Sequence, residues 1–456
     1  MARDVTDMER VTSRDQLVEW FEAGSKIPDQ FRLGTEHEKF PFYQKDLSPV
    51  AYAGPQGIEA LLHGVAGRLG WEKIYDRGQI IGLFDTAGGG AISLEPGGQF
   101  ELSGAPVADV HATAHELDEH LRVAHDVANS LGMSFLGLGM SPLWSLAETP
   151  VMPKQRYVIM KNYMPKVGTR GLDMMFRTST VQVNLDYASE ADMVRKLRAS
   201  LALQPLVSAL FAASPFTEGK PNGFLSMRSE IWRDTDRARS GMMAFAFEPG
   251  MGFERYVDYA LDVPMYFVKR GDTYHDVAGA SFHDLLAGKL ARMPGEVATI
   301  SDWANHLGTI FPEVRLKRYL EMRGADAGPV RHLNALPALF TGLLYDEAAL
   351  DGALELTKGW DATMRQSLRD AVPRLALKAG IGGRPLDSVV RDMLALARGG
   401  LKRRARLDAA GRDETHFLDC LDAMAASGVT LADRLLEAFH GPWGGSVRPS
   451  FAEYVL

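Results

Sequence analysis

The sequence contains almost no cysteine. Its 456 residues include only Cys420, so no disulfide can form within the chain. A protein without internal disulfides does not depend on an oxidising compartment. Cys420 stands at helical spacing from Phe417, Leu421 and Met424, a pattern typical of a buried core thiol.

The two best-known glycine-rich phosphate-binding patterns are also absent. The sequence has no Walker loop, and no Gly-x-Gly-x-x-Gly run follows a predicted strand. A nucleotide bound by this chain must therefore be held in another way.

Long apolar runs are lacking too. Residues 131–144 are short and rich in Gly and Ser, and residues 201–216 are interrupted by Gln204 and Pro205, so neither run is expected to span a membrane. The N-terminus has no apolar leader. The formal net charge is −8, which does not suit a protein that coats nucleic acid or an anionic membrane. We therefore expect a cytoplasmic protein with neither a nucleic-acid nor a membrane partner.

The periodicity of the sequence predicts an α+β protein. Pro96-Gly97-Gly98 and the earlier glycine run are turn signals, and such short connections join antiparallel strands. No Pro-, Ser- or Gly-rich linker divides the chain, so we expect one compact unit over residues 1–456, with a helical C-terminal part from roughly 330 to 456. The expected strands lie at 31–43, within 74–103, at 178–186 and in a hairpin at 265–275, and the expected helices at 13–22, 57–69, 112–131 and 189–211.

Acidic and amide side chains recur at every second position in several of these segments. Residues i and i+2 of a strand point to the same face of a sheet. Segment 34–40 places Glu36 beside Glu38 in this way. Segment 98–102 places Gln99 beside Glu101, shortly after Glu95.

Two further segments continue the pattern. Gln182 and Asn184 share one face of the strand at 178–186, whose other face is apolar and belongs in a core. Glu321 and Arg323 share a face in segment 318–323.

Two interpretations of these polar faces are open. A single antiparallel strand commonly turns its polar face to water. Carboxylates crowded on one face, however, repel one another and raise each other's pKa values, so several together favour a divalent cation between them. Oxygen ligands suit Mg²⁺ or Mn²⁺, and because Mg²⁺ often takes phosphate oxygens as well, the pattern indicates a nucleotide site.

Residues 315–323 concentrate positive charge. Arg315, Lys317, Arg318 and Arg323 lie within nine positions. Guanidinium groups bind phosphate and carboxylate through paired hydrogen bonds. An exposed element paired with neighbouring acidic residues explains the same composition, so this segment alone does not decide between the two.

A second mixed cluster lies at residues 228–239. It contains Arg228, Trp232, Arg233, Asp236 and Arg239. An amino-acid substrate would suit such a set, with Arg for its carboxylate and an acid for its ammonium group. A surface network of salt bridges is the alternative.

Other residues carry weaker signals. Arg156 and Arg170 are further candidates for binding an anion. The histidines within residues 111–125 fit an exposed helix face better than a metal site, because their run is not His-Glu-x-x-His. Met160, Met174 and Met175 are expected to serve in packing.

Four segments together resemble a known family. The runs at 34–40, 95–104, 306–328 and 441–447 are similar to the plant and proteobacterial type of glutamate–cysteine ligase, and the similarity extends from about residue 12 to the end. This resemblance implies a curved, largely antiparallel sheet that cups the active site and is surrounded by helices, as in the wider group that includes glutamine synthetase.

The resemblance also implies a reaction. It is the ATP-dependent joining of the γ-carboxylate of L-glutamate to the amine of L-cysteine through γ-glutamyl phosphate, the first step of glutathione biosynthesis. Phosphorylation would supply the leaving group that a carboxylate lacks. The expected cofactors are ATP and Mg²⁺, with Mn²⁺ as a substitute. Two other functions remain open: a carboxylate–amine ligase with another amine acceptor, and a non-enzymatic protein that binds a metal ion or an amino acid.

Site roles follow residue by residue from the resemblance. The implied metal ligands are Glu36, Glu38, Glu95, Glu101 and Glu321. The implied phosphoryl-stabilising cations are Arg323, Arg315, Lys317 and Arg318, of which Arg318 and Arg323 also contact the nucleotide together with Gln99. The implied substrate-binding residues are Gln182, Asn184, Arg228, Trp232, Arg233, Asp236, Arg239, Tyr256 and Tyr259.

The chain departs from the family pattern in its thiols. Plant members are regulated through cysteine pairs, whereas Cys420 has no partner within this chain. We expect no internal thiol–disulfide control, and either a monomer or a weak homodimer.

Overall fold

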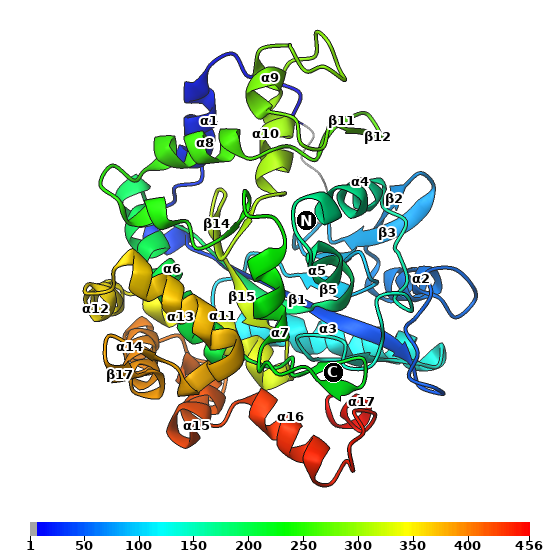
Figure 1. Ribbon diagram of the computed structural model, residues 1–456, viewed down its shortest axis with the longest axis vertical. Helices are drawn as coiled ribbons and strands as arrows, with labels where there is room; N and C mark the ends of the chain where they lie inside the picture. The colour runs from blue at the N-terminus through cyan, green and yellow to red at the C-terminus, as the bar shows by residue number, and fades with distance from the viewer. Residues whose placement is uncertain (1–6) are drawn as a thin grey trace.

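One large antiparallel sheet forms the centre of the computed structural model, which describes residues 7–456 (Figure 1). Every pair of neighbouring strands in this sheet is antiparallel, and β6 pairs with the far end of β1. In sheet order the strands are β14 (Val314–Leu316), β15 (Leu320–Asp326), β7 (Thr180–Leu185), β1 (Leu33–Tyr43), β5 (Phe100–Ser103), β4 (Ala91–Leu94), β3 (Gln79–Phe84) and β2 (Glu72–Asp76), with β6 at Met133–Leu136.

Helices surround the sheet and gather at both of its ends (Figure 1). Helices α3, α6 and α11 contact the central strands, and α2 packs on β3. The helices are α1 (Arg14–Glu22), α2 (Ile58–Leu69), α3 (Val110–Ser130), α4 (Gln155–Tyr163), α5 (Gly171–Arg177), α6 (Glu190–Leu210), α7 (Met227–Ile231), α8 (Phe253–Asp262), α9 (Phe282–Leu286), α10 (Ile300–Leu307), α11 (Val330–Leu344), α12 (Glu347–Thr357), α13 (Ala362–Leu375), α14 (Leu386–Arg404), α15 (Asp419–Ser427), α16 (Leu431–His440) and α17 (Ser450–Glu453).

Small two-stranded sheets complete the architecture. The expected hairpin near residue 270 is formed by β11 and β12. The short strands are β8 (Phe216–Thr217), β9 (Lys220–Pro221), β10 (Ser240–Gly241), β11 (Phe267–Arg270), β12 (Thr273–Asp276), β13 (Phe311–Pro312), β16 (Gly380–Ile381) and β17 (Arg384–Pro385). The α+β fold with a curved, largely antiparallel sheet is confirmed.

Local sequence signals explain several of these elements. Ser13 and Gln16 form the predicted capping box at the start of α1. The apolar side chains of β7, Val181, Val183 and Leu185, are at most 1% exposed, so this strand faces a core on one side and the polar row on the other. Cys420 is only half-buried: it packs against the edge of the core, and its Sγ lies 3.5 Å from the carbonyl oxygen of Arg331.

Strand β15 contains an irregularity that bears on the site. Glu321 lies opposite Asn184 of β7, whereas Asp326, five positions later, lies opposite Thr180, four positions earlier. One extra residue is therefore inserted between Met322 and Ala325. A bulge of this kind changes which face the following side chains point to, so Asp326 joins the face of Glu321 in spite of the odd spacing.

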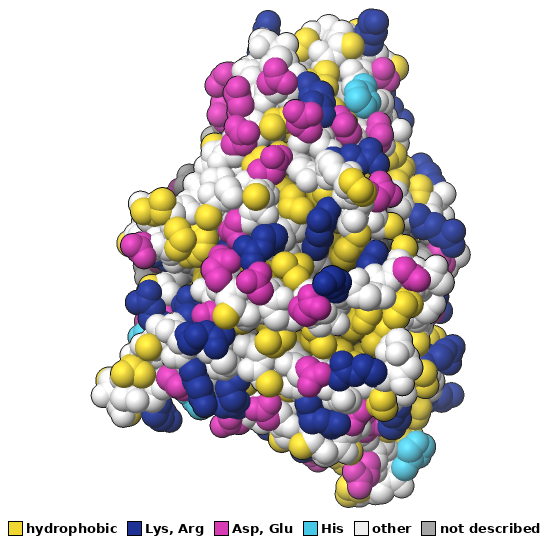
Figure 2. All heavy atoms as spheres, turned by 90° about the vertical axis from the view of Figure 1, so that its left-hand side faces the viewer, with side chains coloured by type: hydrophobic (Ala, Val, Ile, Leu, Met, Phe, Trp, Pro, Cys, Tyr) yellow, Lys and Arg dark blue, Asp and Glu magenta, His cyan; other side chains and the backbone are white. Residues whose placement is uncertain are grey.

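The surface mixes charges of both signs. On the face that Figure 2 shows, Lys and Arg side chains lie interspersed with Asp and Glu. None of the helices in residues 7–456 is both long and apolar enough to cross a membrane.

The turn between β4 and β5 generates a first prediction. Gly98 has φ +89°, and a Cβ on Gly97 would run into the carbonyl group of Phe176. Gly97→Ala is therefore expected to cost about 1–3 kcal/mol of unfolding free energy, measured by chemical denaturation. Gly67→Ala in α2 is the matched control, because its Cβ would meet nothing within 4 Å and alanine favours a helix. Equal stabilities of the two variants would contradict this packing of the turn.

Candidate active site

A row of polar side chains crosses the central strands on one face of the sheet. The strand register sets Glu38 of β1 opposite Glu101 of β5, and Glu36 of β1 opposite Gln182 of β7. Residues directly opposite each other share a face. The period-two segments found in the sequence therefore converge on one surface.

This surface lines a cavity that encloses about 1090 Å³, part of which is open to solvent. Side chains from α4, α5, α7 and α10 also line it. Of the predicted site residues, the cavity is lined by Glu36, Glu38, Glu95, Gln99, Glu101, Gln182, Arg228, Trp232, Arg315, Lys317 and Arg323.

Four glutamates form the acidic wall of the cavity. Burial raises the pKa of Glu38 well above its usual value, and the negative charges of Glu95 and Glu101 add to the shift. The pKa of Glu36 is raised too, first by burial and then by Glu321 and Glu101. Both shifts therefore come first from burial and then from the neighbouring carboxylates.

Neutral donors hold these glutamates in place. Asn184 donates to Glu36 at 3.0 Å, the Thr180 backbone N–H donates to Glu38 at 3.1 Å, and Ser93 donates to Glu101. These donors carry no charge, so their hydrogen bonds do not offset the negative charge of the acidic wall.

The donor set of the acidic wall fits a hard divalent cation. Carboxylate oxygens are the ligands that Mg²⁺ and Mn²⁺ prefer. Within residues 7–456, no three His, Cys, Asp or Glu side chains already surround a single point. Mg²⁺ does not require such a cage, since it keeps water molecules and takes substrate phosphate oxygens.

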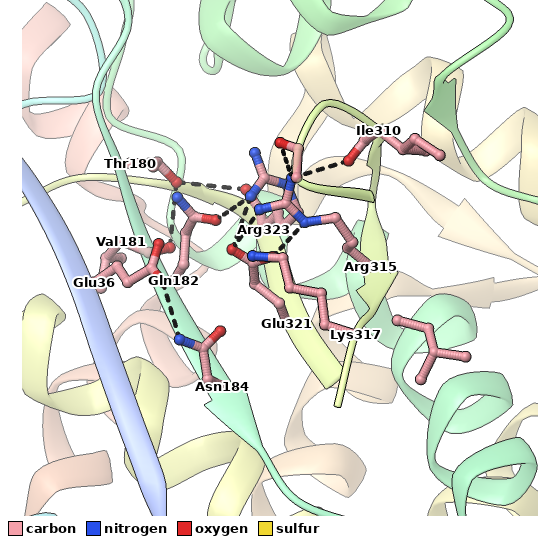
Figure 3. A network of polar contacts seen from close by, with 12 residues as sticks. Glu36, Thr180, Val181, Gln182, Asn184, Ile310, Arg315, Lys317, Glu321 and Arg323 are labelled. Carbon is pink, nitrogen blue, oxygen red and sulfur yellow. Dashed lines mark hydrogen bonds and ion pairs between the residues drawn. The ribbon is translucent and has the colours of Figure 1, made fainter. Parts of the chain in front are cut away.

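The next part of the same sheet face is cationic and is called here the cationic wall; Figure 3 shows its network of contacts. It is built around Glu321, which has no solvent exposure. Arg315 grips both of its oxygens, with Nε at 2.5 Å and Nη2 at 2.9 Å. Arg323 Nη1 lies 3.0 Å and Lys317 Nζ 3.5 Å from the same carboxylate. Burial acts to raise the pKa of Glu321, but these three cations hold it well below its usual value.

Arg315, Arg323 and Lys317 differ in how many of their N–H groups are already used within the protein. Arg315 also donates through Nη1 to the carbonyl oxygens of Gly308 and Ile310, so nearly all its N–H groups are used. Arg323 donates through Nη1 to Gln182 at 2.6 Å and to Glu321, and the guanidinium lies along the cavity. Burial beside Arg315 lowers the pKa of Lys317 to about 8.

Gln99 lines the cavity but its amide is already occupied. Its Oε1 accepts from the Gly97 backbone N–H at 2.9 Å, and its Nε2 donates to the Thr178 carbonyl oxygen at 2.8 Å. It thereby ties the β4–β5 turn to the start of β7.

The structure places several predicted residues away from the cavity. Arg318 lies in the turn between β14 and β15, where it is exposed and stacks on Trp20 at 4.9 Å. Its Nε also donates to the Trp20 carbonyl oxygen at 3.2 Å, and Arg318 does not line the cavity. Arg233 pairs at the surface with Glu230 and Asp370.

The remaining substrate candidates form internal supports. Asp236 and Arg239 are a buried pair at 2.6 Å, and Arg239 also donates to the carbonyl oxygens of Thr309 and Pro264. Tyr256 accepts from the Leu316 backbone N–H at 3.1 Å, and Tyr259 packs on Phe245. None of these four residues lines the cavity among the described residues.

Sequence reasoning missed or undervalued other lining residues. Arg156 was only a secondary candidate. The methionines 160, 174 and 175 were assigned to packing, but they form an apolar part of the wall. Asn305, Thr309 and Phe311 enter the cavity from α10 and the chain after it. No strand periodicity marks those positions, because a helix end and a loop present them.

Comparison with known proteins identifies the family. The sequence model of the glutamate–cysteine ligase family 2 matches residues 32–453. The chain is 55% identical over 441 residues to the chloroplastic glutamate–cysteine ligase of Nicotiana tabacum, and the match covers 97% of this chain and 82% of that protein. It is 54% identical to the chloroplastic glutamate–cysteine ligase of Arabidopsis thaliana over the same shares.

A solved structure shares the fold. The glutamate–cysteine ligase of Francisella tularensis, determined in complex with AMP, superposes with a TM-score of 0.55 and 12% sequence identity, covering 91% of this chain and 86% of that one. At this identity the likeness concerns the fold alone.

The expected compartment requires a correction. The sequence led us to expect a cytoplasmic protein, but the similar plant enzymes are named chloroplastic, which contradicts that expectation. The expectation relied on the composition of the first residues, which carries no information about the location of the family.

The resemblance drawn from the sequence is confirmed, and with it the predicted activity. The non-enzymatic alternative is wrong, because relatives more than half identical over nearly the whole chain are enzymes. The chain belongs to the glutamate–cysteine ligase family 2 and is an enzyme that joins glutamate to cysteine, the first step of glutathione biosynthesis.

Proposed function

We propose that the cavity binds ATP together with Mg²⁺, L-glutamate and L-cysteine, and that ligation proceeds through γ-glutamyl phosphate. The observation that carries this proposal is the pairing of an acidic wall with a buried cationic wall in one cavity. A polyphosphate with its counter-cation needs both.

The chemistry consists of two displacements. A γ-carboxylate oxygen of glutamate attacks the γ-phosphorus of ATP, and ADP leaves. The free amine of cysteine then attacks the acyl carbon, phosphate leaves with the bonding electrons, and the new amide loses a proton. Neither step requires a nucleophile from the protein.

The acidic wall would hold the metal ion. Glu36, Glu38, Glu95 and Glu101 supply oxygen ligands, and a bound Mg²⁺, or Mn²⁺ in its place, would neutralise phosphate charge. Asn184 and Ser93 keep two of these carboxylates oriented.

The cationic wall would stabilise the phosphoryl group during transfer. Arg323 and Lys317 face the cavity, and positive groups fixed before the reaction avoid the reorganisation that solvent would need. Arg315 and Glu321 act behind them, since their groups are largely occupied with each other.

Other side chains that line the cavity would bind the amino-acid substrates. Arg228 is 3% exposed and lines the cavity beside Trp232, which suits it to a substrate carboxylate. Gln182 holds Arg323 and lines the same space.

Other properties of the chain remain predictions. The packing of α11 against β1 and β7 supports one catalytic unit in which the helical part from about residue 330 belongs to the sheet domain. A monomer or weak homodimer, and the lack of nucleic-acid and membrane partners, are expectations from the sequence alone.

The reaction itself gives the first test. ADP release from ATP is expected to require Mg²⁺, glutamate and cysteine together, and the product should have the mass of γ-glutamylcysteine. Chelation of the metal should abolish release, and Mg²⁺ or Mn²⁺ should restore it. Release that occurs with glutamate but is indifferent to cysteine would keep the phosphorylation step and indicate another amine acceptor.

Glu38→Gln separates metal binding from stability. Removing one of the crowded carboxylates is expected to lower kcat/KM by at least about 100-fold, because the metal loses a ligand. The same change should leave the melting temperature of the metal-free protein equal or higher, because it relieves repulsion. Glu119→Gln, on the exposed side of α3, is the control for both assays. A large loss of stability in Glu38→Gln would contradict the crowding argument.

Glu321→Gln should behave in the opposite way. The variant leaves Arg315, Lys317 and Arg323 buried without their counter-charge. Because removing one partner of a buried ion pair is strongly destabilising, the free energy of unfolding is expected to fall by about 3–5 kcal/mol. Denaturant unfolding measures this directly, and activity should fall with it. Wild-type stability together with near-normal turnover would remove Glu321 from the proposed architecture.

A further inference from the structure

Asp326 is a buried carboxylate that the ligation chemistry does not use. It is 1% exposed at the end of β15, three residues after Arg323. The bulge in β15 directs it to the same face as Glu321. It does not line the cavity.

Both carboxylate oxygens of Asp326 accept hydrogen bonds from one region of the chain. Oδ2 accepts from the Ala213 backbone N–H at 2.9 Å and from the Ser214 hydroxyl at 2.6 Å. Oδ1 accepts from the Ser226 hydroxyl at 2.8 Å. The carboxylate thus joins the end of α6 to the start of α7.

The two serines that donate to Asp326 also accept hydrogen bonds from the backbone of α7. Ser226 is the N-cap of that helix, and its oxygen accepts from the Ser229 backbone N–H at 3.1 Å. The Ser214 oxygen accepts from the Arg228 backbone N–H, also at 3.1 Å. A helix of five residues is too short to be stable by itself, so these external bonds fix its position.

Helix α7 and the residue that follows it contribute two side chains to the lining of the cavity. Arg228 lies in it and Trp232 follows it directly. Arg228 Nη2 also donates to the Arg323 carbonyl oxygen at 2.9 Å, which ties the helix a second time to β15. Arg228 is therefore tied to β15 at two points, in addition to the backbone hydrogen bonds that join this segment to Ser214 and Pro373.

We propose that Asp326 is a positioning residue for ligation, which acts through Ser214 and Ser226 to hold Arg228 and Trp232 where a substrate carboxylate binds. This inference rests on the proposed function, which assigns the substrate carboxylate to Arg228. The negative charge of Asp326 also favours the charged form of Arg228 electrostatically.

The test compares Asp326→Asn with Asp433→Asn. Asp433 accepts the same number of hydrogen bonds, from Thr430 N, Thr430 Oγ1 and Lys378, but caps the remote α16. In Asp326→Asn, KM for one amino-acid substrate is expected to rise about tenfold or more, while KM for ATP changes less than about twofold. Asp433→Asn should leave all three KM values unchanged.

A double-mutant cycle with Arg228→Lys shows whether Asp326 acts through Arg228. If it does, the KM effects of Asp326→Asn and Arg228→Lys are non-additive. Additive effects, or an equal loss of kcat/KM for all three substrates, overturn the proposal. If Asp326→Asn does not fold, Ser214→Ala provides the same comparison with a smaller expected rise in KM, and an unchanged KM in a folded Ser214→Ala overturns it.

The same experiments separate this proposal from the function on which it rests. A wild-type protein that forms no γ-glutamylcysteine refutes the proposed function. A wild-type protein that forms it, together with an Asp326→Asn variant of unchanged KM, refutes only the role of Asp326.

Discussion

The site depends on the balance of charge around Glu321. One carboxylate without solvent exposure holds three cations, Arg315, Lys317 and Arg323, beside a cavity. Burying an ion is expensive unless it is paired with good geometry, and the two-pronged grip of Arg315 provides that geometry. Only with this compensation can the sheet carry a polar row through the middle of the protein.

The balance is incomplete on the other wall. Glu36 and Glu38 receive hydrogen bonds from an amide and a backbone N–H rather than from Lys or Arg. Burial, and after it the neighbouring carboxylates, raises the pKa values of both glutamates. The three cations around Glu321 outnumber its single negative charge, but their ion pairs are made with Glu321 and not with Glu36 or Glu38, so a divalent cation from solution would suit the acidic wall. This asymmetry is the physical reason to assign the metal to the glutamates of β1, β4–β5 and β5.

Strand β1 shows how strongly the sheet is buried. Its polar face lines the cavity, and its other face, with His37 and Lys39, is covered by α3 and α11. Burial lowers the pKa of Lys39 to about 7 and that of His37 well below its usual value. A strand enclosed on both faces has little freedom, so Glu36 and Glu38 are held rigidly.

Periodicity made much of the fold and the centre of the site predictable. Wherever a strand is regular, residues i and i+2 share a face, and this rule alone pairs Glu36 with Glu38 and Gln182 with Asn184. The same logic could not find Asp326, because the bulge in β15 shifts the register by one residue. Arg318 was proposed from the cluster of basic residues and the family resemblance rather than from periodicity, and the structure places it in the turn between β14 and β15, outside the cavity lining.

The composition of a segment did not predict which of its residues reach the cavity, because several of them form salt bridges instead. The segment 228–239 has the residues of a substrate site, yet Arg233, Asp236 and Arg239 are used in salt bridges and only Arg228 and Trp232 reach the cavity. Conversely, nothing in the sequence brings Asn305 or Thr309 to the site, because tertiary packing of α10 places them there.

The absence of a glycine-rich phosphate loop follows from this architecture. Such a loop binds phosphate through backbone N–H groups that are free because the loop is irregular. The positive charge along this cavity comes from side chains instead, among them Arg228, Arg315, Lys317 and Arg323. Lys317 follows the edge strand β14 and Arg323 lies at the bulge of β15, so their side chains are held by contacts with Glu321 and, for Arg323, with Gln182. Because of the bulge, two nearby residues of β15 have different roles. Arg323 lines the cavity, whereas Asp326, three positions later, accepts hydrogen bonds from the residues that hold α7.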